Sequence, residues 1–208
     1  MQPDLTNILQ QGCDELKLKL SQEQIQQLLD YLRLLQKWNK VYSLTAINNP
    51  RQMVIYHLLD GLSAVSYFAN YSSVLDVGSG MGVPGIILAI IYPQTAVTLI
   101  DSNSKKTAFL QQVKIELGLT NLQVICSRIE ALPIENRYMA ITSRAFADLN
   151  LFVELSGKFL AANGSILALK GELAFNEVAQ IDVWDNEIIE IQVPFLDAKR
   201  FLVKLVRK

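Results

Sequence analysis

The chain has 208 residues, half of them hydrophobic, so it is long enough to fold around a core of its own. Its formal net charge of −1 gives no overall attraction to nucleic acid, so contact with a polyanion must depend on local basic clusters. No apolar run is long enough for a membrane-spanning helix, and Cys13 and Cys126 have neither a disulfide pattern nor CxxC spacing. We therefore expect a cytoplasmic protein, a monomer, with no metal and no membrane partner.

Residues 5–68 are predicted to be helical, because their apolar side chains recur at intervals of three and four. Ser21 is a predicted N-cap, since a glutamine three residues later completes a capping box. A second long helix is expected after Pro50. The polar stretch WNKVYSLTAINNP, residues 38–50, is predicted to connect the two helices. We expect residues 1–70 to form a helical extension.

From Ser73 onward, short β-rich runs alternate with helical stretches. The predicted strands are VLDVG, VTLID, LQVIC, MAITS and SILAL, and the predicted helices are residues 84–92, 104–118 and 148–161. This alternation predicts a mostly parallel sheet that is covered on both faces. The tail segments WDNEIIEIQVPF and RFLVKLVRK lack a full helix between them, so they predict a closing antiparallel pair. Residues 71–208 are therefore expected to form a Rossmann-like, doubly wound α/β domain.

The stretch SSVLDVGSGMGVPG, residues 72–85, is a candidate ligand-binding turn between the first strand and its helix. Gly80, Gly82 and Gly85 satisfy the spacing G-x-G-x-x-G, and Asp101 ends the next strand about 20 residues later. On spacing alone, this pattern fits a dinucleotide such as NAD. The Asp101 carboxylate can accept hydrogen bonds from ribose hydroxyls of a dinucleotide or of S-adenosylmethionine, so it does not distinguish the two ligands.

Asp76 does distinguish a dinucleotide from S-adenosylmethionine. It lies in the strand two residues before Gly78, so we expect its carboxylate to point toward the crevice at the strand's end. There it would repel a pyrophosphate and attract a sulfonium and an ammonium group, which favours S-adenosylmethionine. Pro84 also favours S-adenosylmethionine, because it offers no N–H group to a phosphate cradle. The open alternatives are an NAD(P)-binding oxidoreductase, a methyltransferase with another acceptor, and a binding module that transfers nothing.

The end of the fourth predicted strand bears on the methyl acceptor. Its sequence TSRAF, residues 142–146, lacks the Asn/Asp-Pro-Pro-aromatic pattern of many enzymes that methylate exocyclic amines. Attack at cytosine carbon 5 needs a cysteine nucleophile that commonly follows a proline, whereas Cys126 follows an isoleucine within a strand. A purine ring nitrogen with a free lone pair remains, and it needs positioning rather than a base.

Several motifs, taken in order, resemble one family. They are WNKVYSLTAI, HLLD, LDVGSGMGVPGI, TLIDS, SRIE, SRAFADL and ALKG, and they follow one another as in the bacterial 16S ribosomal RNA guanine-N7 methyltransferases, or glucose-inhibited division protein B. The resemblance covers about residues 25–208. It implies a class I methyltransferase fold with seven strands, one of them antiparallel. It also implies S-adenosylmethionine as the donor and a guanine of 16S ribosomal RNA as the acceptor.

The resemblance also implies where the cofactor binds. The matching motif positions are Gly78, Val83, Ile129, Glu130 and Arg144. Asp76, Gly80 and Asp101 join this set from the residue-based analysis above. For Glu130, a solvated acid at a helix start is the alternative interpretation.

Guanine nitrogen 7 carries a lone pair and no proton, so the expected reaction is a direct in-line displacement without a general base. Recognition must leave this nitrogen free, which excludes a bidentate arginine on the major-groove edge. The candidates for positioning the substrate are Arg144, Lys170, Arg128, Asn39 and His57. The alternative for Lys170 is a surface lysine, and the alternative for His57 is a buried residue that orients Asn39. Trp38, which precedes Asn39 in the connector, is interpreted as a core residue.

Overall fold

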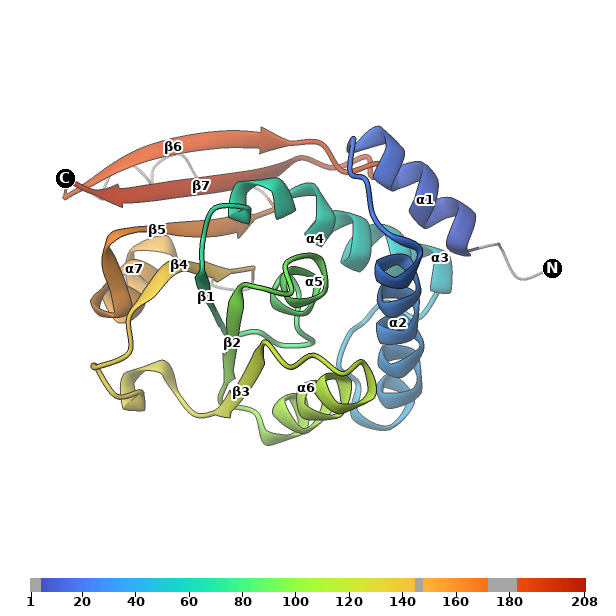
Figure 1. The fold of residues 1–208 in the computed structure, drawn as a ribbon, viewed down its shortest axis with the longest axis horizontal. Coiled ribbons are helices and arrows are strands. Elements are labelled where there is room, and N and C mark those ends of the chain that lie inside the picture. Colours follow the sequence, from blue (N-terminus) through green and yellow to red (C-terminus); the bar gives the residue numbers. More distant parts are fainter. Residues whose placement is uncertain (1–4, 145–147, 172–182) are drawn as a thin grey trace.

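A computed structural model describes residues 5–144, 148–171 and 183–208 of the chain. These residues form one sheet with helices on both faces (Figure 1). The strands are β1 (Ser73–Val77), β2 (Ala96–Asp101), β3 (Leu122–Cys126), β4 (Tyr138–Ser143), β5 (Leu160–Lys170), β6 (Trp184–Ile191) and β7 (Arg200–Arg207). The helices are α1 (Leu5–Glu15), α2 (Gln22–Tyr42), α3 (Pro50–Met53), α4 (Asp60–Ser63), α5 (Gly85–Ile91), α6 (Ser104–Glu116) and α7 (Leu149–Ser156).

The strands lie in the order β3-β2-β1-β4-β5-β7-β6 in a 7-stranded sheet. Strands β1 to β5 pair in parallel, whereas β7 pairs in the antiparallel direction with both β5 and β6. The strand order reverses between β1 and β4, and ligands of doubly wound sheets bind outside the carboxyl ends of strands at such a point. The topology confirms the predicted class I methyltransferase fold with one antiparallel strand.

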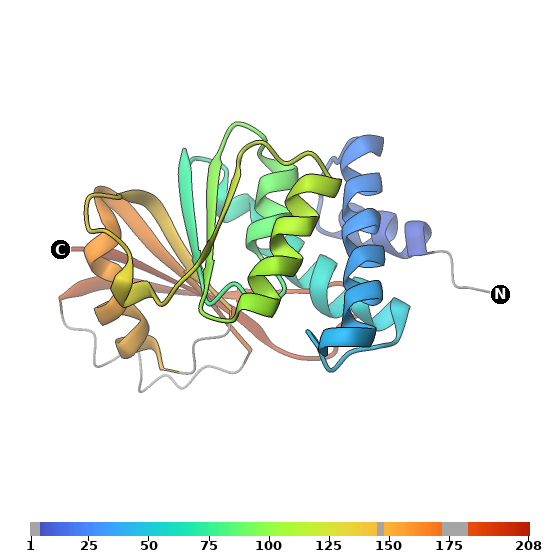
Figure 2. The same ribbon diagram turned by 90° about the horizontal axis from the view of Figure 1, so that it is seen from below.

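The helices form layers around this sheet. Figure 2 shows α5 and α6 on one face, with α2 beyond them, and α7 on the opposite face. One apolar core joins buried side chains of α1 and α2 to those of α5 and α6, and a second lies between the sheet and α7. None of the helices in the described ranges is long and apolar enough to cross a membrane.

Helix α2 begins as predicted and ends later than predicted. The Ser21 hydroxyl accepts a hydrogen bond from the Gln24 backbone N–H at 3.1 Å, and the Gln24 side chain accepts one from the Ser21 N–H at 3.0 Å. The expected connector over residues 38–50 is wrong at its start, because the helix continues to Tyr42. Trp38 packs against Phe109 of α6, with ring centroids 5.7 Å apart, and this contact keeps the last turns helical.

The helices predicted after Pro50 and over residues 148–161 are also interrupted or shorter than expected. After Pro50 the chain forms α3, then a π-helical segment over Val54–Leu59, then α4. The helix expected over residues 148–161 ends at Ser156, because Leu160 already pairs with Tyr138 in the sheet.

Candidate functional site

The glycine turn connects β1 to α5 beside the point where the strand order reverses. Gly78, Gly80 and Gly82 have φ angles of 66°, 58° and 101°, a left-handed region that side chains disfavour. Gly85 is required for a different reason: a Cβ atom there would lie 2.1 Å from a methyl group of Leu99. The glycines thus allow a tight turn and close packing of α5 on the sheet.

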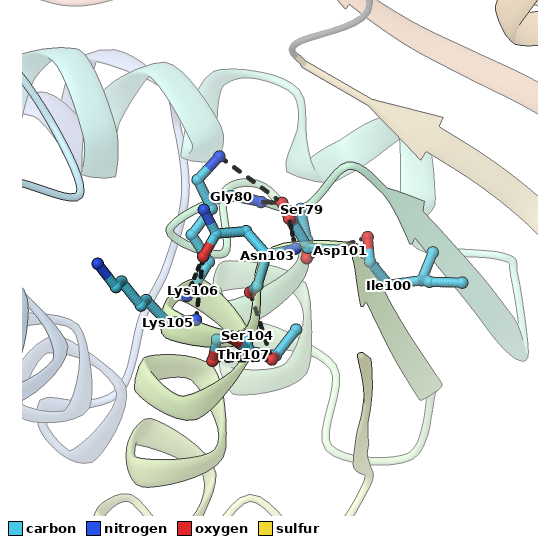
Figure 3. Close-up of polar contacts among 9 residues, drawn as sticks. All are labelled: Ser79, Gly80, Ile100, Asp101, Asn103, Ser104, Lys105, Lys106 and Thr107. Carbon is cyan, nitrogen blue, oxygen red and sulfur yellow. Dashed lines mark hydrogen bonds and ion pairs between the residues drawn. The ribbon is translucent and has the colours of Figure 1, made fainter. Parts of the chain in front are cut away.

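Asp101 holds the turn against the end of β2. Its Oδ2 accepts a hydrogen bond from the Gly80 N–H at 2.9 Å, and its Oδ1 accepts one from the Asn103 N–H at 2.8 Å. The Lys106 ammonium lies 3.9 Å from Oδ2. Figure 3 shows this carboxylate between the glycine turn and the first residues of α6. Asp101 is buried, so its position is fixed by these contacts.

A cavity of about 520 Å³, which we call the strand-end cavity, opens beside Asp101. Its walls bring together the predicted residues Gly78, Asp101, Arg128, Ile129 and Glu130. Asp148, a lysine and apolar side chains of α7 also line it. The cavity therefore offers an apolar surface with carboxylates at its edge. Such a combination suits a nucleoside, because a flat ring can pack on the apolar wall while hydroxyl groups donate to carboxylates.

A second cavity of about 440 Å³, the extension cavity, lies on the other side of the glycine turn. It brings the predicted residues His57, Arg144 and Lys170 together. Met81 of the glycine turn also lines it, whereas Gly78 lines the strand-end cavity. The turn therefore forms a wall of both cavities. The structure thus places Arg144 and Lys170 with each other, and Arg128 in the other cavity.

Asp60 of α4 joins two arginines in the extension cavity. Its Oδ2 lies 3.1 Å from Nη1 of Arg144, and its Oδ1 lies 2.7 Å from Nε of Arg200 at the start of β7. Arg144 also donates to the Tyr56 carbonyl oxygen at 3.2 Å. Because the Asp60 side chain is only 6% exposed, two cationic partners offset the cost of burying its charge. Asp60 was not among the predicted site residues, although the quoted motif HLLD contains it, and Arg200 was expected only as part of a local basic cluster with Lys199.

His57 belongs to a hydrogen-bonded chain behind this cavity. Its Nε2 lies 3.1 Å from the Thr45 hydroxyl oxygen, and the Thr45 N–H donates to Asn39 Oδ1 at 2.8 Å. The Asn39 amide donates in turn to Asn48 Oδ1 at 2.8 Å. Asn39 is buried behind Thr45 rather than in a cavity wall. This chain fixes the connector that carries Thr45 over the extension cavity.

The electrostatic surroundings keep His57 neutral. Burial, and then the charge of Arg144, lower its pKa to about 4, against weaker opposing effects of the Tyr56 backbone and of Asp60. Among the described residues, its buried Nδ1 has no hydrogen-bond partner. The side chain therefore serves as a neutral hydrogen-bonding group at physiological pH.

Asp76 and Val83 lie beneath the turn rather than in a cavity wall. Asp76 Oδ2 accepts a hydrogen bond from the Gly85 N–H at 3.0 Å, so the carboxylate faces the first turn of α5. Its contacts therefore do not match the expected orientation into the crevice, because the Gly85 amide draws it to the helix. Burial raises the pKa of Asp76 to about 7, and its Oδ1 has no hydrogen-bond partner in the described part of the chain. Val83 is buried near Gly61.

With this geometry established, comparison with known proteins identifies the family. Residues 24–202 match the family GidB, described as rRNA small subunit methyltransferase G. The chain belongs to this family. The resemblance that the motifs indicated is thereby confirmed, and so is the assignment of the chain as an enzyme.

Curated relatives in the same family match almost the whole chain. A protein named ribosomal RNA small subunit methyltransferase G from Janthinobacterium sp. (strain Marseille) is 49% identical over 99% of this chain and 96% of its own length. Its namesake from Herminiimonas arsenicoxydans is 50% identical over 99% of this chain and 97% of its own length. The chain therefore spans the length of these family members.

Solved structures of lower identity share the fold. The plantazolicin methyltransferase BpumL, in complex with SAH, has a TM-score of 0.60 at 15% identity and covers 90% of this chain and 99% of its own. A ribosomal protein L11 methylase from Lactobacillus delbrueckii subsp. bulgaricus has a TM-score of 0.56 at 12% identity, with coverage of 79% and 89%. Both have the class I methyltransferase architecture seen for this family member.

Proposed function

We propose that the chain transfers a methyl group from S-adenosylmethionine to nitrogen 7 of a guanine in 16S ribosomal RNA. Family membership supports rRNA of the small subunit as the substrate and a methyl group as the group transferred. The observation that carries the proposal is the pair of cavities on opposite sides of the glycine turn. The strand-end cavity presents carboxylates and two cationic side chains beside an apolar wall, and the extension cavity presents three cationic side chains around one carboxylate.

The residues of the strand-end cavity fit S-adenosylmethionine. Asp101 would accept hydrogen bonds from the ribose, and Ile129 with Glu130 would hold the ring and edge of the adenine. Asp76 lines neither cavity, but its Oδ1 has no partner among the described residues, and the positive charge of a sulfonium or ammonium group bound at the turn above it would stabilise the charged carboxylate. When bound, this cofactor supplies an electrophilic methyl group on a positively charged sulfur. A pyrophosphate would instead oppose the same carboxylate, so we do not favour a nicotinamide dinucleotide.

The extension cavity fits a guanine with its flanking phosphates. Arg144, Arg200 and Lys170 line it, and Asp60 offsets part of their charge while it holds the two guanidinium groups in place. A single cationic donor to the guanine carbonyl oxygen would leave nitrogen 7 free. The remaining cationic groups would contact phosphates, which fix the orientation of the RNA.

The chemistry that these residues must perform is positioning. The guanine lone pair attacks carbon directly, and no proton leaves nitrogen 7, so a neutral His57 is compatible with the reaction. Well-oriented reactants gain up to about 7–11 kcal/mol relative to free encounter. In this proposal, Arg144 orients the guanine, Lys170 contacts an adjacent phosphate, and the Asn39–Thr45–His57 chain fixes the connector above them.

We also propose that the protein acts as a cytoplasmic monomer in which residues 1–70 extend a methyltransferase domain over residues 71–208. One apolar core is shared between the helical segment and α5 and α6, which supports an extension packed on the domain rather than a separate unit. Sedimentation equilibrium of the purified protein tests the monomeric state, and a mass of twice the 23.3 kDa of one chain would contradict it.

The decisive experiment maps the methylated atom. Unmodified 30S subunits and naked 16S rRNA are incubated with S-adenosylmethionine that carries a labelled methyl group, and the products are digested and mass-mapped. We expect label on nitrogen 7 of one guanine, and a loss of about 10- to 100-fold in rate for Arg144→Gln, the usual effect of a lost hydrogen bond from a charged group, but not for the exposed Arg137→Gln. Label on a ribose, an exocyclic amine or a protein would contradict the proposed acceptor.

A further inference from the structure

The glycine turn is held from outside the sheet by a tyrosine of α2. The hydroxyl group of Tyr31 donates a hydrogen bond of 2.9 Å to the carbonyl oxygen of Met81. Tyr31 is fully buried, and its ring lies 6.2 Å from that of Phe109 in α6. Burial, together with the charge of Asp76, raises the pKa of Tyr31, so its hydroxyl remains a donor at all physiological pH values.

Met81 lies between two glycines of the turn, where local side chains do little to fix the backbone conformation. Gly80 and Gly82, on either side of it, both have positive φ angles. A glycine reaches many backbone conformations at similar energy, so the orientation of the Met81 carbonyl needs external support. The Tyr31 hydroxyl supplies such support from a helix 50 residues away in sequence.

The hydrogen bonds on the other side of the turn come from β2. The Gly78 and Ser79 N–H groups donate to the Ile100 carbonyl oxygen at 2.9 and 3.2 Å, and the Gly80 N–H donates to Asp101. The turn is therefore held on one side by the strand and on the opposite side by α2. Since Met81 lines the extension cavity and Gly78 lines the strand-end cavity, a displaced Met81 changes the shape of the wall between them.

We propose that Tyr31 is a positioning residue for methyl transfer, which acts by fixing the Met81 carbonyl and thereby the glycine turn that separates cofactor from acceptor. The proposal rests on the proposed function, because it assumes that the cofactor binds on this turn. It assigns the helical extension a part in cofactor binding, beyond any part in contacting RNA.

A second tyrosine supplies a matched control. Tyr92 follows α5, and its hydroxyl donates to the Val65 carbonyl oxygen at 3.0 Å. Both tyrosines thus join the helical segment to the sheet domain through one hydroxyl-to-carbonyl bond. Tyr92, however, lies at the end of α5 that is about 10 Å from the glycine turn. Loss of its hydroxyl weakens the same junction without touching the turn.

The test compares Tyr31→Phe with Tyr92→Phe, each of which removes one oxygen atom and keeps the ring that fills the core. Calorimetric titration with S-adenosylhomocysteine gives the dissociation constant, and steady-state methylation gives KM for each substrate. We expect Tyr31→Phe to raise the dissociation constant and the KM for S-adenosylmethionine by about three- to ten-fold, the usual effect of one lost hydrogen bond. The KM for RNA should rise as well, because Met81 lines the extension cavity, and Tyr92→Phe should leave these constants at wild-type values.

The outcomes separate this proposal from the proposed function. If wild-type protein does not bind S-adenosylhomocysteine, the proposed function fails. If wild-type protein binds it and the two variants bind equally well or equally weakly, the role of Tyr31 is purely structural and the positioning proposal is overturned. Thermal unfolding of both variants checks that they remain folded at the assay temperature, so a selective loss of affinity in Tyr31→Phe is assigned to the turn.

Discussion

The carboxyl group of Asp76 lies fully buried beneath the glycine turn, and its environment couples protein stability to pH. Burial raises its pKa from 3.8 to about 7, while the Gly85 hydrogen bond and the charge of Arg144 act in the opposite direction. The folded protein therefore holds a proton on Asp76 at pH values where the unfolded chain has lost it. Its contribution to stability is present below about pH 4 and is lost as the pH rises toward 7.

His57 produces the opposite slope. Its pKa is lowered from 6.5 to about 4, so the unfolded chain takes up a proton there before the folded protein does. The contribution of His57 is present above pH 6.5 and is lost as the pH falls toward 4. The stability of the wild-type protein alone therefore cannot isolate Asp76, and a variant is needed.

We predict that Asp76→Asn stabilises the cofactor-free protein increasingly as the pH rises from 5 to 8. The asparagine oxygen still accepts a hydrogen bond from Gly85, but the side chain no longer carries a buried charge at high pH. Urea unfolding of both proteins at pH 5, 6.5 and 8 measures the difference, and His57 cancels because it is present in both. A difference in unfolding free energy that stays constant across these pH values would contradict the raised pKa.

Single residues of the turn were predictable because their signal is local. The glycine spacing and Asp101 indicated a ligand-binding turn, and the structure places Gly78, Asp101, Ile129 and Glu130 around one cavity. The orientation of Asp76 was not predictable in the same way. Whether a carboxylate at the end of a strand faces a cavity or a helix depends on the Gly85 amide, whose position follows from the packing of α5.

At the scale of the helices and strands, α2 connects the extension to the ends of two other helices. The Gln24 side-chain amide donates to the carbonyl oxygens of Ile90 and Ile91 at 3.3 and 3.2 Å, at the end of α5. The Gln27 amide donates to the Leu117 carbonyl oxygen, just after α6, at 3.2 Å. The last carbonyls of a helix lack intrahelical partners, so these glutamines satisfy groups that α5 and α6 leave open.

This arrangement predicts a sensitive substitution, Gln24→Glu. The carboxylate keeps the acceptor for the Ser21 N–H in the capping box but loses the donor for Ile90 and Ile91 and brings a negative charge near their carbonyl oxygens. We expect a loss of about 1–2 kcal/mol in unfolding free energy, measured by urea denaturation.

The matched control for that substitution is Gln22→Glu at the first position of the same helix. An acidic residue in the first turn interacts favourably with the helix dipole, so we expect no loss of stability there. Equal losses in the two variants would show that the contacts of Gln24 with α5 contribute nothing.

Helix and strand types followed from periodicity, whereas interruptions did not. The strands and the capping box at Ser21 lie where the sequence predicted them, because alternating patterns and cap residues act over a few residues. The π-helical segment Val54–Leu59 was missed. Its side chains are apolar around most of the helix, so the sequence there favours no particular face and does not distinguish an α-helical from a π-helical turn.

For the whole molecule, the charge distribution sets how the protein meets RNA. A net charge of −1 gives little long-range attraction, so affinity must come from the cationic residues of the extension cavity, Arg144, Lys170 and Arg200. Each phosphate neutralised on single-stranded RNA contributes about −0.7 to the slope of log affinity against log salt concentration. Because only a few phosphates are contacted in this proposal, we expect a shallow slope of log affinity against log salt concentration.

We predict that Lys170→Ala reduces the magnitude of this slope by about 0.7, because one phosphate contact is lost. Fluorescence anisotropy with labelled 16S rRNA between 50 and 200 mM salt measures it. Lys19→Ala, at an exposed lysine between α1 and α2, serves as the control and should leave the slope unchanged. An unchanged slope for Lys170→Ala would place this lysine away from the phosphates.

The composition of the extension cavity could not be read from the sequence. Asp60 lies on a helix, Arg144 just after a parallel strand and Arg200 at the start of the antiparallel strand, and no local pattern relates them. Their meeting depends on the strand order, which places β7 beside β5 and the start of β7 near α4.

The Asp60–Arg200 contact joins residues that are 140 positions apart in the sequence, and this has a consequence during synthesis. Because α4 emerges from the ribosome well before β7, a nascent chain contains the Asp60 carboxylate before its second arginine is available. The extension cavity can therefore be completed only after β7 has emerged.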